Sequence, residues 1–199
     1  MKIISVRNLY QCDHSSSTYH FYTERSLSDK ERAAVQKLAG IKPGRHSLDI
    51  HRGGDWELSM EVEDELLEKY YDVMISESYD WWTARVALDY SEELWNALKP
   101  CEGRGEEDLG VDVEREGSRI LVSFYFAVDY DSAFRVLGEE LFEELTDLFL
   151  YIREDILGGD FSALKVICDF YDAEVETDWK GVGTVSKAAR KFGKILGRV

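Results

Sequence analysis

The stretch from Val111 to Val128, VDVEREGSRILVSFYFAV, decides how this chain folds. Its first residues alternate between apolar and charged side chains, which is the pattern of a strand with one covered face. Glu116-Gly117 then indicates a turn, and the run from Ile120 to Phe126 is the most apolar strand pattern in the sequence. We therefore predict a β-hairpin whose second strand lies centrally in a sheet.

Segments on both sides of this hairpin carry helix and strand patterns. Ser28 is followed three residues later by Glu31, which is the spacing of a capping box and predicts a helix from 29 to 39 that ends at Gly40. Periodicity predicts further helices over 62–71, 91–98 and 161–171, and strands over 19–23, 47–51, 73–76 and 83–88.

A long helix is predicted from 132 to 157, because apolar residues recur there every three or four positions. Leu141 and Leu145 lie in the middle of this stripe and are expected in the core, whereas Glu144 is expected at the surface. The segment 102–112 is acidic and rich in glycine, and we expect a mobile loop there.

Elements that alternate early and cluster late predict an α+β fold, with helices packed on a mostly antiparallel sheet. We expect one acidic domain over residues 1–178 and a basic amphipathic tail over 179–199. Val185, Phe192 and Ile195 recur in the tail at helical spacing, opposite a basic face. An isolated helix of this length is marginal in water, so the tail needs a surface. The acids of this protein's own body or of a neighbouring copy are the first choice, and a partner protein is the second. We expect the core of residues 1–170 to be complete without the tail.

The composition favours a soluble, cytoplasmic protein. The chain has 199 residues, of which 44% are apolar, and a formal net charge of −16, so a sizeable core lies under a strongly acidic surface. Such a surface repels nucleic-acid phosphates and anionic membranes and attracts basic partners. Three cysteines without a CxxC pair do not make a disulfide framework, and we recognise neither a signal peptide nor a membrane span.

Several loose motifs resemble a family of mainly bacterial proteins whose function is uncharacterised. The motifs run in order through most of residues 13–170 and fall in three stretches: Asp13–Ser16 with Tyr19–Tyr22 and Leu27-Ser28; Gly54–Trp56 with Leu66–Asp72 and Trp82–Arg85; and Arg153–Leu157 with Gly159-Asp160 and Ala163-Leu164. Members of that family often have Trp-Gly-Thr where this chain has Trp81-Trp82-Thr83. The resemblance implies a shared fold and no particular reaction.

Arg85 is the most interesting candidate binding residue, because it lies in an aromatic neighbourhood with Trp81 and Trp82. A guanidinium there could stack on an indole or hold a carboxylate of a ligand or partner. The plainer interpretation is an ion pair with a nearby acid such as Asp55 or Asp72. We take Asp55, Trp81, Trp82 and Arg85 as one candidate binding site. A second candidate site consists of basic residues of the tail: Lys187, Arg190, Lys191 and Lys194.

No pattern in the sequence specifies a catalytic residue, a cofactor or a metal. His14, His46, Asp49 and His51 belong to the densest set of His and Asp residues, but HExxH and HxH spacings are missing. We therefore expect these histidines to serve the structure or the surface rather than a metal site. The sequence also has no P-loop, no GxGxxG and no GxSxG motif.

Three classes of function remain open. The leading hypothesis is a non-enzymatic protein-binding or regulatory module of the inhibitor or immunity type, whose acidic face meets a basic protein partner. An enzyme with a non-standard pocket near Arg85, Trp82, Asp55 and His14 is the second. Nucleic-acid contact through the basic tail is the third, although the acidic body argues against it. The tail could also join copies of the chain into a homo-oligomer, and the acidic surface could equally be a solvated face.

Overall fold

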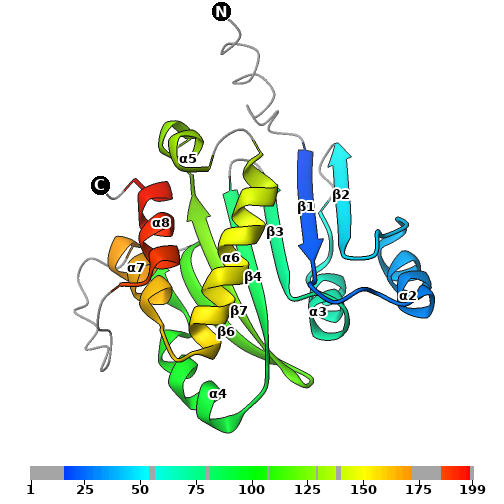
Figure 1. The fold of residues 1–199 in the computed structure, drawn as a ribbon, viewed down its shortest axis with the longest axis horizontal. Coiled ribbons are helices and arrows are strands. Elements are labelled where there is room, and N and C mark those ends of the chain that lie inside the picture. The colour runs from blue at the N-terminus through cyan, green and yellow to red at the C-terminus, as the bar shows by residue number, and fades with distance from the viewer. Residues whose placement is uncertain are drawn as a thin grey trace, which may run out of the picture.

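A seven-stranded sheet forms the centre of the protein in a computed structural model that describes residues 16–53, 57–78, 81–106, 108–128, 130–137, 140–171 and 185–197. The strand order is β2-β1-β3-β4-β7-β6-β5, and all neighbouring strands are antiparallel (Figure 1). The strands are β1 (Ser16–Tyr22), β2 (Ser47–Gly53), β3 (Val73–Ser78), β4 (Trp81–Asp89), β5 (Arg104–Glu106), β6 (Leu109–Glu116) and β7 (Arg119–Ala127).

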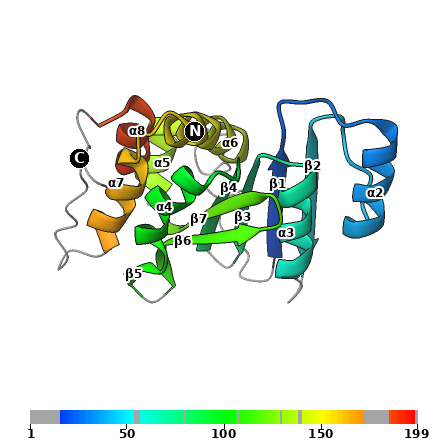
Figure 2. The same cartoon turned by 90° about the horizontal axis from the view of Figure 1, so that it is seen from below.

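Helices cover both faces of this sheet, with α3 on one side and α5, α6 and α8 on the other (Figure 2). The helices are α2 (Asp29–Ala39), α3 (Met60–Lys69), α4 (Glu92–Leu98), the 3₁₀ helix η1 (Lys99–Cys101), α5 (Tyr130–Leu137), α6 (Leu141–Leu157), α7 (Ser162–Tyr171) and α8 (Lys187–Ile195). Helices on an antiparallel sheet confirm the predicted α+β fold. Within the described ranges, no helix combines the length and the apolar character that a membrane span requires.

The two faces of the sheet build two hydrophobic cores, because successive side chains of a strand point to opposite faces. Val86 and Phe124 lie in the larger core with α6, α7 and α8. Ala87 and Leu121 lie in the smaller core with α2 and α3. The middle strands are therefore buried on both faces, which explains their nearly continuous apolar sequences.

The hairpin that the sequence predicted is formed by β6 and β7. Strand β7 pairs with β6 on one side and with β4 on the other, so it is an interior strand, while β4 occupies the middle position. The capping box is also confirmed: the Ser28 side chain accepts a hydrogen bond from the Glu31 amide, and the Glu31 side chain accepts one from the Ser28 amide. Gly40 ends that helix in a left-handed conformation.

The predicted long helix is two helices, α5 and α6, and residues 138 and 139 between them lie outside the described residues. The prediction that Leu141 and Leu145 are core residues is nevertheless confirmed, because both are buried in the larger core. Glu144, at the edge of that stripe, is half-buried.

The expectation of a mobile loop over 102–112 is wrong, because β5 and the start of β6 pair within this segment. Gly105 and Gly110 face each other in this ladder with φ values of 141° and 135°, a region that favours glycine. A Cβ atom on Gly105 would lie 1.9 Å from the carbonyl oxygen of Leu109. The glycines that indicated a loop therefore allow two strands to approach closely.

The tail helix α8 is part of the larger core, which corrects the expectation that this core is complete without it. The ring of Phe192 is fully buried and packs against three other rings, with centroid distances of 5.9 Å to Phe124, 5.3 Å to Phe126 and 5.3 Å to Phe149. Hydrophobic burial, rather than charge attraction, therefore fixes the helix. The proposed boundary between domain and tail, at residues 178 and 179, lies outside the described residues.

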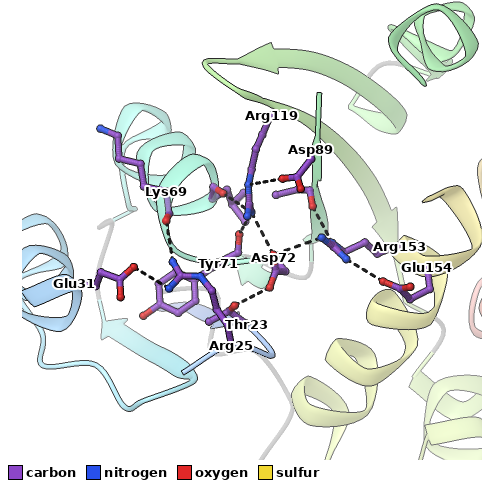
Figure 3. Close-up of polar contacts among 12 residues, drawn as sticks. Thr23, Arg25, Glu31, Lys69, Tyr71, Asp72, Asp89, Arg119, Arg153 and Glu154 are labelled. Atoms are coloured by element: carbon purple, nitrogen blue, oxygen red, sulfur yellow. Dashed lines mark hydrogen bonds and ion pairs between the residues drawn. The ribbon is translucent and has the colours of Figure 1, made fainter. Parts of the chain in front are cut away.

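Asp72 joins three distant parts of the chain at one end of the sheet (Figure 3). Its carboxylate accepts hydrogen bonds from the Thr23 hydroxyl at 2.7 Å and from the Arg119 guanidinium at 3.3 Å. Arg153 of α6 lies 3.6 Å from the same carboxylate, and its Nε donates to the carbonyl of Ala87 at 2.9 Å. This junction therefore links the residue after β1 with β7 and α6, and Arg153 ties α6 to β4 as well. The predicted pairing of Asp72 with Arg85 is not formed.

Guanidinium groups also satisfy the carbonyls at the end of α3 (Figure 3). Arg119 donates to the carbonyls of Leu67, at 3.1 Å, and Tyr71, at 2.7 Å, while Arg25 donates to that of Lys69 at 3.1 Å. The last carbonyls of a helix lack partners inside the helix and carry the negative end of its dipole, so cations are favourable there.

We predict that Phe192→Ala lowers the free energy of unfolding by ~3–5 kcal/mol, the usual cost of emptying a buried aromatic site. Val185→Ala, at an exposed position just before the same helix, should cost no more than ~0.5 kcal/mol. Urea unfolding followed by far-ultraviolet circular dichroism measures both values. Equal costs for the two variants would show that α8 is not part of the core.

We predict that Asp72→Ala costs about 3 kcal/mol, because it leaves two half-buried arginines without their shared carboxylate. Asp89→Ala serves as the control: Asp89 also faces Arg119, at 3.7 Å, but its side chain is 88% exposed. That variant should change the free energy of unfolding by less than ~0.5 kcal/mol. A small cost for Asp72→Ala in the same urea experiment would contradict the role of this junction.

Candidate functional site

Arg85 lies under α3, on the face of the sheet that carries the smaller core, and its side chain is only 4% exposed. Its Nη2 donates to Asp64 at 2.6 Å and lies 3.6 Å from Glu114, while its Nη1 donates to Glu63 at 3.3 Å. Nε donates to the Ser123 hydroxyl at 3.0 Å on the neighbouring strand β7. The ion-pair interpretation of Arg85 is thus correct in kind, but its partners come from α3 and β6.

The other residues of this predicted site do not all join Arg85. Trp81 and Trp82 are consecutive on β4 and therefore point to opposite faces. The Trp82 ring is buried against Phe142 of α6, at a centroid distance of 5.0 Å, whereas Trp81 is half exposed. Asp55, like His14 of the alternative pocket, lies outside the described residues.

A cleft of about 640 Å³ opens beside Arg85. We call it the acidic cleft, and its lining is Tyr19, Glu57, Leu58, Met60, Glu63, Ser76, Ser78, Trp81, Trp82, Thr83, Arg85, Asp108 and Tyr125. Besides its tyrosines, this lining has four ionisable groups: the carboxyl groups of Glu57, Glu63 and Asp108 and the guanidinium of Arg85. Sequence reasoning found Arg85 and Trp81 but missed Glu63 and Asp108, which no motif marks.

Cross-strand pairing builds the floor of the acidic cleft. Tyr19, Ser76, Thr83 and Tyr125 follow one another in register across β1, β3, β4 and β7, so they form one row on the same face. The Tyr19 hydroxyl accepts a hydrogen bond from the amide of Leu58 at 3.2 Å, which ties the segment before α3 to this row.

The entrance of the acidic cleft combines acids with apolar side chains. The Ser78 hydroxyl donates to Glu57 at 2.9 Å, which fixes that carboxylate at the edge. Met60 is 60% exposed and Trp81 is 49% exposed, so two large apolar side chains meet solvent here. Exposed large apolar groups beside charged ones are typical of binding surfaces.

Glu63 is the carboxyl group in the cleft whose ionisation is most altered. Burial raises its pKa from 4.5 to about 7, although the charge of Arg85 opposes this shift. Burial also disfavours the charge of Arg85, but Asp64 and Glu63 outweigh it, so the pKa of Arg85 is raised and the guanidinium stays charged. Asp64 makes the shorter hydrogen bond to Arg85, at 2.6 Å, and Glu63 the longer one, at 3.3 Å.

A smaller hollow of about 350 Å³ continues the acidic cleft, because Asp108 and Tyr125 line both. Its other walls come from the β5–β6 ladder, where Gly105 and Gly110 carry no side chains that could fill the space. Burial raises the pKa of the Tyr125 hydroxyl, so this phenol stays neutral at physiological pH and can donate a hydrogen bond.

The histidines do not form a metal site with other residues that the structure describes. His20 shares a hydrogen bond with Asp49, and His51 shares one with Thr18 at 2.9 Å, on the face of the β1–β2 pair opposite the smaller core. Among the described residues, no group of three or more His, Cys, Asp or Glu side chains is placed to hold a metal ion.

The basic residues predicted in the tail do come together. Lys187, Arg190, Lys191 and Lys194 line a groove of about 360 Å³ between α8 and α5. Arg135 of α5 completes the set, and sequence reasoning missed it because it lies some fifty residues away in the chain. This groove belongs to the side of the sheet that carries the larger core, and thus not to the acidic cleft.

Comparisons of the chain with family models, with curated proteins and with solved structures find no match. The chemistry of the two candidate sites therefore rests on their own geometry.

We predict that stability falls as pH rises from about 4.5 to about 7, because the folded state keeps the Glu63 proton that the unfolded chain loses. This contribution is complete below pH ~4.5 and is lost above the folded-state pKa. The decline should not exceed about 1.4 kcal/mol per pH unit for one proton. Groups with lowered pKa values, such as Glu31 at about 2, act only at lower pH.

Glu63→Gln should flatten this decline, since glutamine is neutral at every pH. Urea unfolding at several pH values between 4.5 and 8 measures it, with Glu24→Gln, an exposed position at the other end of β1, as the control. A decline that survives in Glu63→Gln would mean that another group takes up the proton.

Proposed function

We propose that this protein is a non-enzymatic protein-binding module whose acidic cleft receives a basic side chain of a partner. The observation that carries the proposal is the arrangement around Arg85. Its single positive charge is already shared between Asp64 and Glu114, so it does not neutralise Glu57 and Asp108 as well. An incoming cation relieves the repulsion among these carboxylates, whereas an anion would increase it.

The shape of the cleft supports a long basic side chain rather than a small cation. Trp81 and Met60 at the entrance can pack against the aliphatic stem of an arginine or lysine, and the indole face attracts the charged head. Ser76 and Thr83 on the floor offer hydroxyl oxygens as acceptors for guanidinium N–H groups. Tryptophan is enriched among the residues that contribute most to binding at protein interfaces.

An enzyme that uses the same cleft is the second candidate, and the raised pKa of Glu63 favours it. A carboxyl group with a pKa of about 7 beside a guanidinium suits general acid–base catalysis at neutral pH. It ranks second because neither histidine nor cysteine, the most frequent general base and a strong nucleophile, belongs to the described lining. We also propose that the chain belongs to the bacterial family that its motifs resemble. This membership would not favour either function, because it implies no particular reaction.

The proposal predicts that a short arginine-rich peptide binds the protein, quenches Trp81 fluorescence and is released by salt. Glu57→Gln/Asp108→Asn should weaken this binding at least about tenfold, the effect of ~1.4 kcal/mol. The matched control is Glu24→Gln/Asp89→Asn, which removes the same charges near the opposite end of the sheet and should change affinity less than ~2-fold. Titration calorimetry at fixed ionic strength measures all three proteins. Equal losses in both double variants would indicate attraction to the whole acidic surface and would refute a specific cleft.

The partner itself can be captured by a photo-crosslinking amino acid at Met60, which is exposed beside the cleft. The same amino acid at Tyr151, 68% exposed on α6, is the control for nonspecific crosslinking. We expect a discrete adduct only from position 60, and we expect the arginine-rich peptide to compete it away.

A further inference from the structure

The groove between α5 and α8 is the second charged concavity of the protein, and the proposed function does not use it. We call it the basic groove, and its lining is Arg135, Val136, Lys187, Arg190, Lys191 and Lys194. Five of these six residues are cationic, in a chain whose formal net charge is −16. Its volume of about 360 Å³ lies at the lower end of the range for small-ligand sites.

The position of the basic groove follows from the way α8 packs. The helix buries Ala188, Ala189, Phe192 and Ile195 in the larger core, so its remaining face must look outward. Lysine and arginine occupy that face at positions i, i+3, i+4 and i+7, which lie in one stripe along a helix. Burial of the opposite face therefore fixes the direction in which the four cations point.

The neighbouring helices hold this stripe in place. Gly193 allows α8 to approach α7 closely, since a Cβ atom there would lie 3.3 Å from Val166. Helix α5 also contacts α8 (Figure 1), and its residues Arg135 and Val136 line the groove. The five cations are thus presented by two packed helices rather than by a mobile tail.

Among the residues that the structure describes, acidic side chains compensate little of the charge on the four cations of α8. Lys191 lies 3.4 Å from Glu144 of α6, and Arg190 donates to the carbonyl of Val185 at 3.3 Å. None of the described lining residues is acidic. Like charges gathered in one concavity repel one another unless an anion shares them.

We propose that the basic groove binds a compact polyanion of the phosphate class, with two or more phosphoryl groups. Arginine forks pair with phosphate oxygens in a bidentate manner, and lysines add point charges around them. Several phosphoryl groups match five cations better than one carboxylate does. A long nucleic acid is disfavoured, because beyond the groove it would run over the acidic surface of the body.

The test is titration calorimetry with inorganic tripolyphosphate, pyrophosphate and sulfate at one ionic strength of ~0.1 M. We expect affinity to fall in that order. Lys187→Gln/Lys194→Gln should weaken tripolyphosphate binding at least about tenfold. The control is Lys37→Gln/Lys42→Gln, which removes two exposed lysines on and just after α2 and should leave affinity within ~2-fold.

Three results would overturn the proposal: no binding of tripolyphosphate by the unaltered protein, equal weakening by both double variants, or tighter binding of a short single-stranded oligonucleotide than of tripolyphosphate at the same salt. The third result would assign the basic groove to nucleic acid instead. Because all four lysines are exposed, the variants should keep the unfolding midpoint of the unaltered protein, which a urea titration checks.

Discussion

A permanent charge buried beneath a helix governs the layout of one whole face of the protein. Arg85 cannot lose its proton, so the surrounding structure must supply counter-charges and hydrogen-bond acceptors or the strand could not be covered. The first turns of α3 supply Glu63 and Asp64, and β7 supplies the Ser123 hydroxyl. This requirement places the first turns of α3 above β4. It also explains why acidic side chains lie between α3 and the sheet, where apolar side chains would be usual.

The two charged concavities arise from different forces and lie with different cores. The acidic cleft lies beside a buried guanidinium, and one of the acids that contact it, Glu63, also lines the cleft. The basic groove exists because Phe192 and its apolar neighbours pull one face of α8 into the larger core and leave the cations outside. A sheet with helices on both faces keeps the two apart, so each can take its own ligand without neutralising the other.

Local sequence patterns predicted most helices and strands. The features that they did not predict depend on contacts between residues far apart in the chain. The capping box at Ser28 and the stripe through Leu145 are encoded within a few residues, so both were predictable. The partners of Arg85 come from segments more than twenty residues away, and one sequence gives no signal for which of many acids will lie there. Arg135 was missed for the same reason. The burial of Phe192 was not predictable either, because amphipathic spacing shows that one face of a helix will be buried but not which part of the protein it packs against.

The strand that contains Gly105, which pairs closely with Gly110, also determines what one edge of the sheet exposes to other chains. Strand β5 is an edge of the sheet, and an open edge is a template on which another chain can add a strand and start aggregation. This edge is only three residues long, and its central residue, Gly105, has a φ of 141°, which favours glycine. So short a strand offers few backbone groups to an added strand, and the edge therefore discourages fibrous self-association.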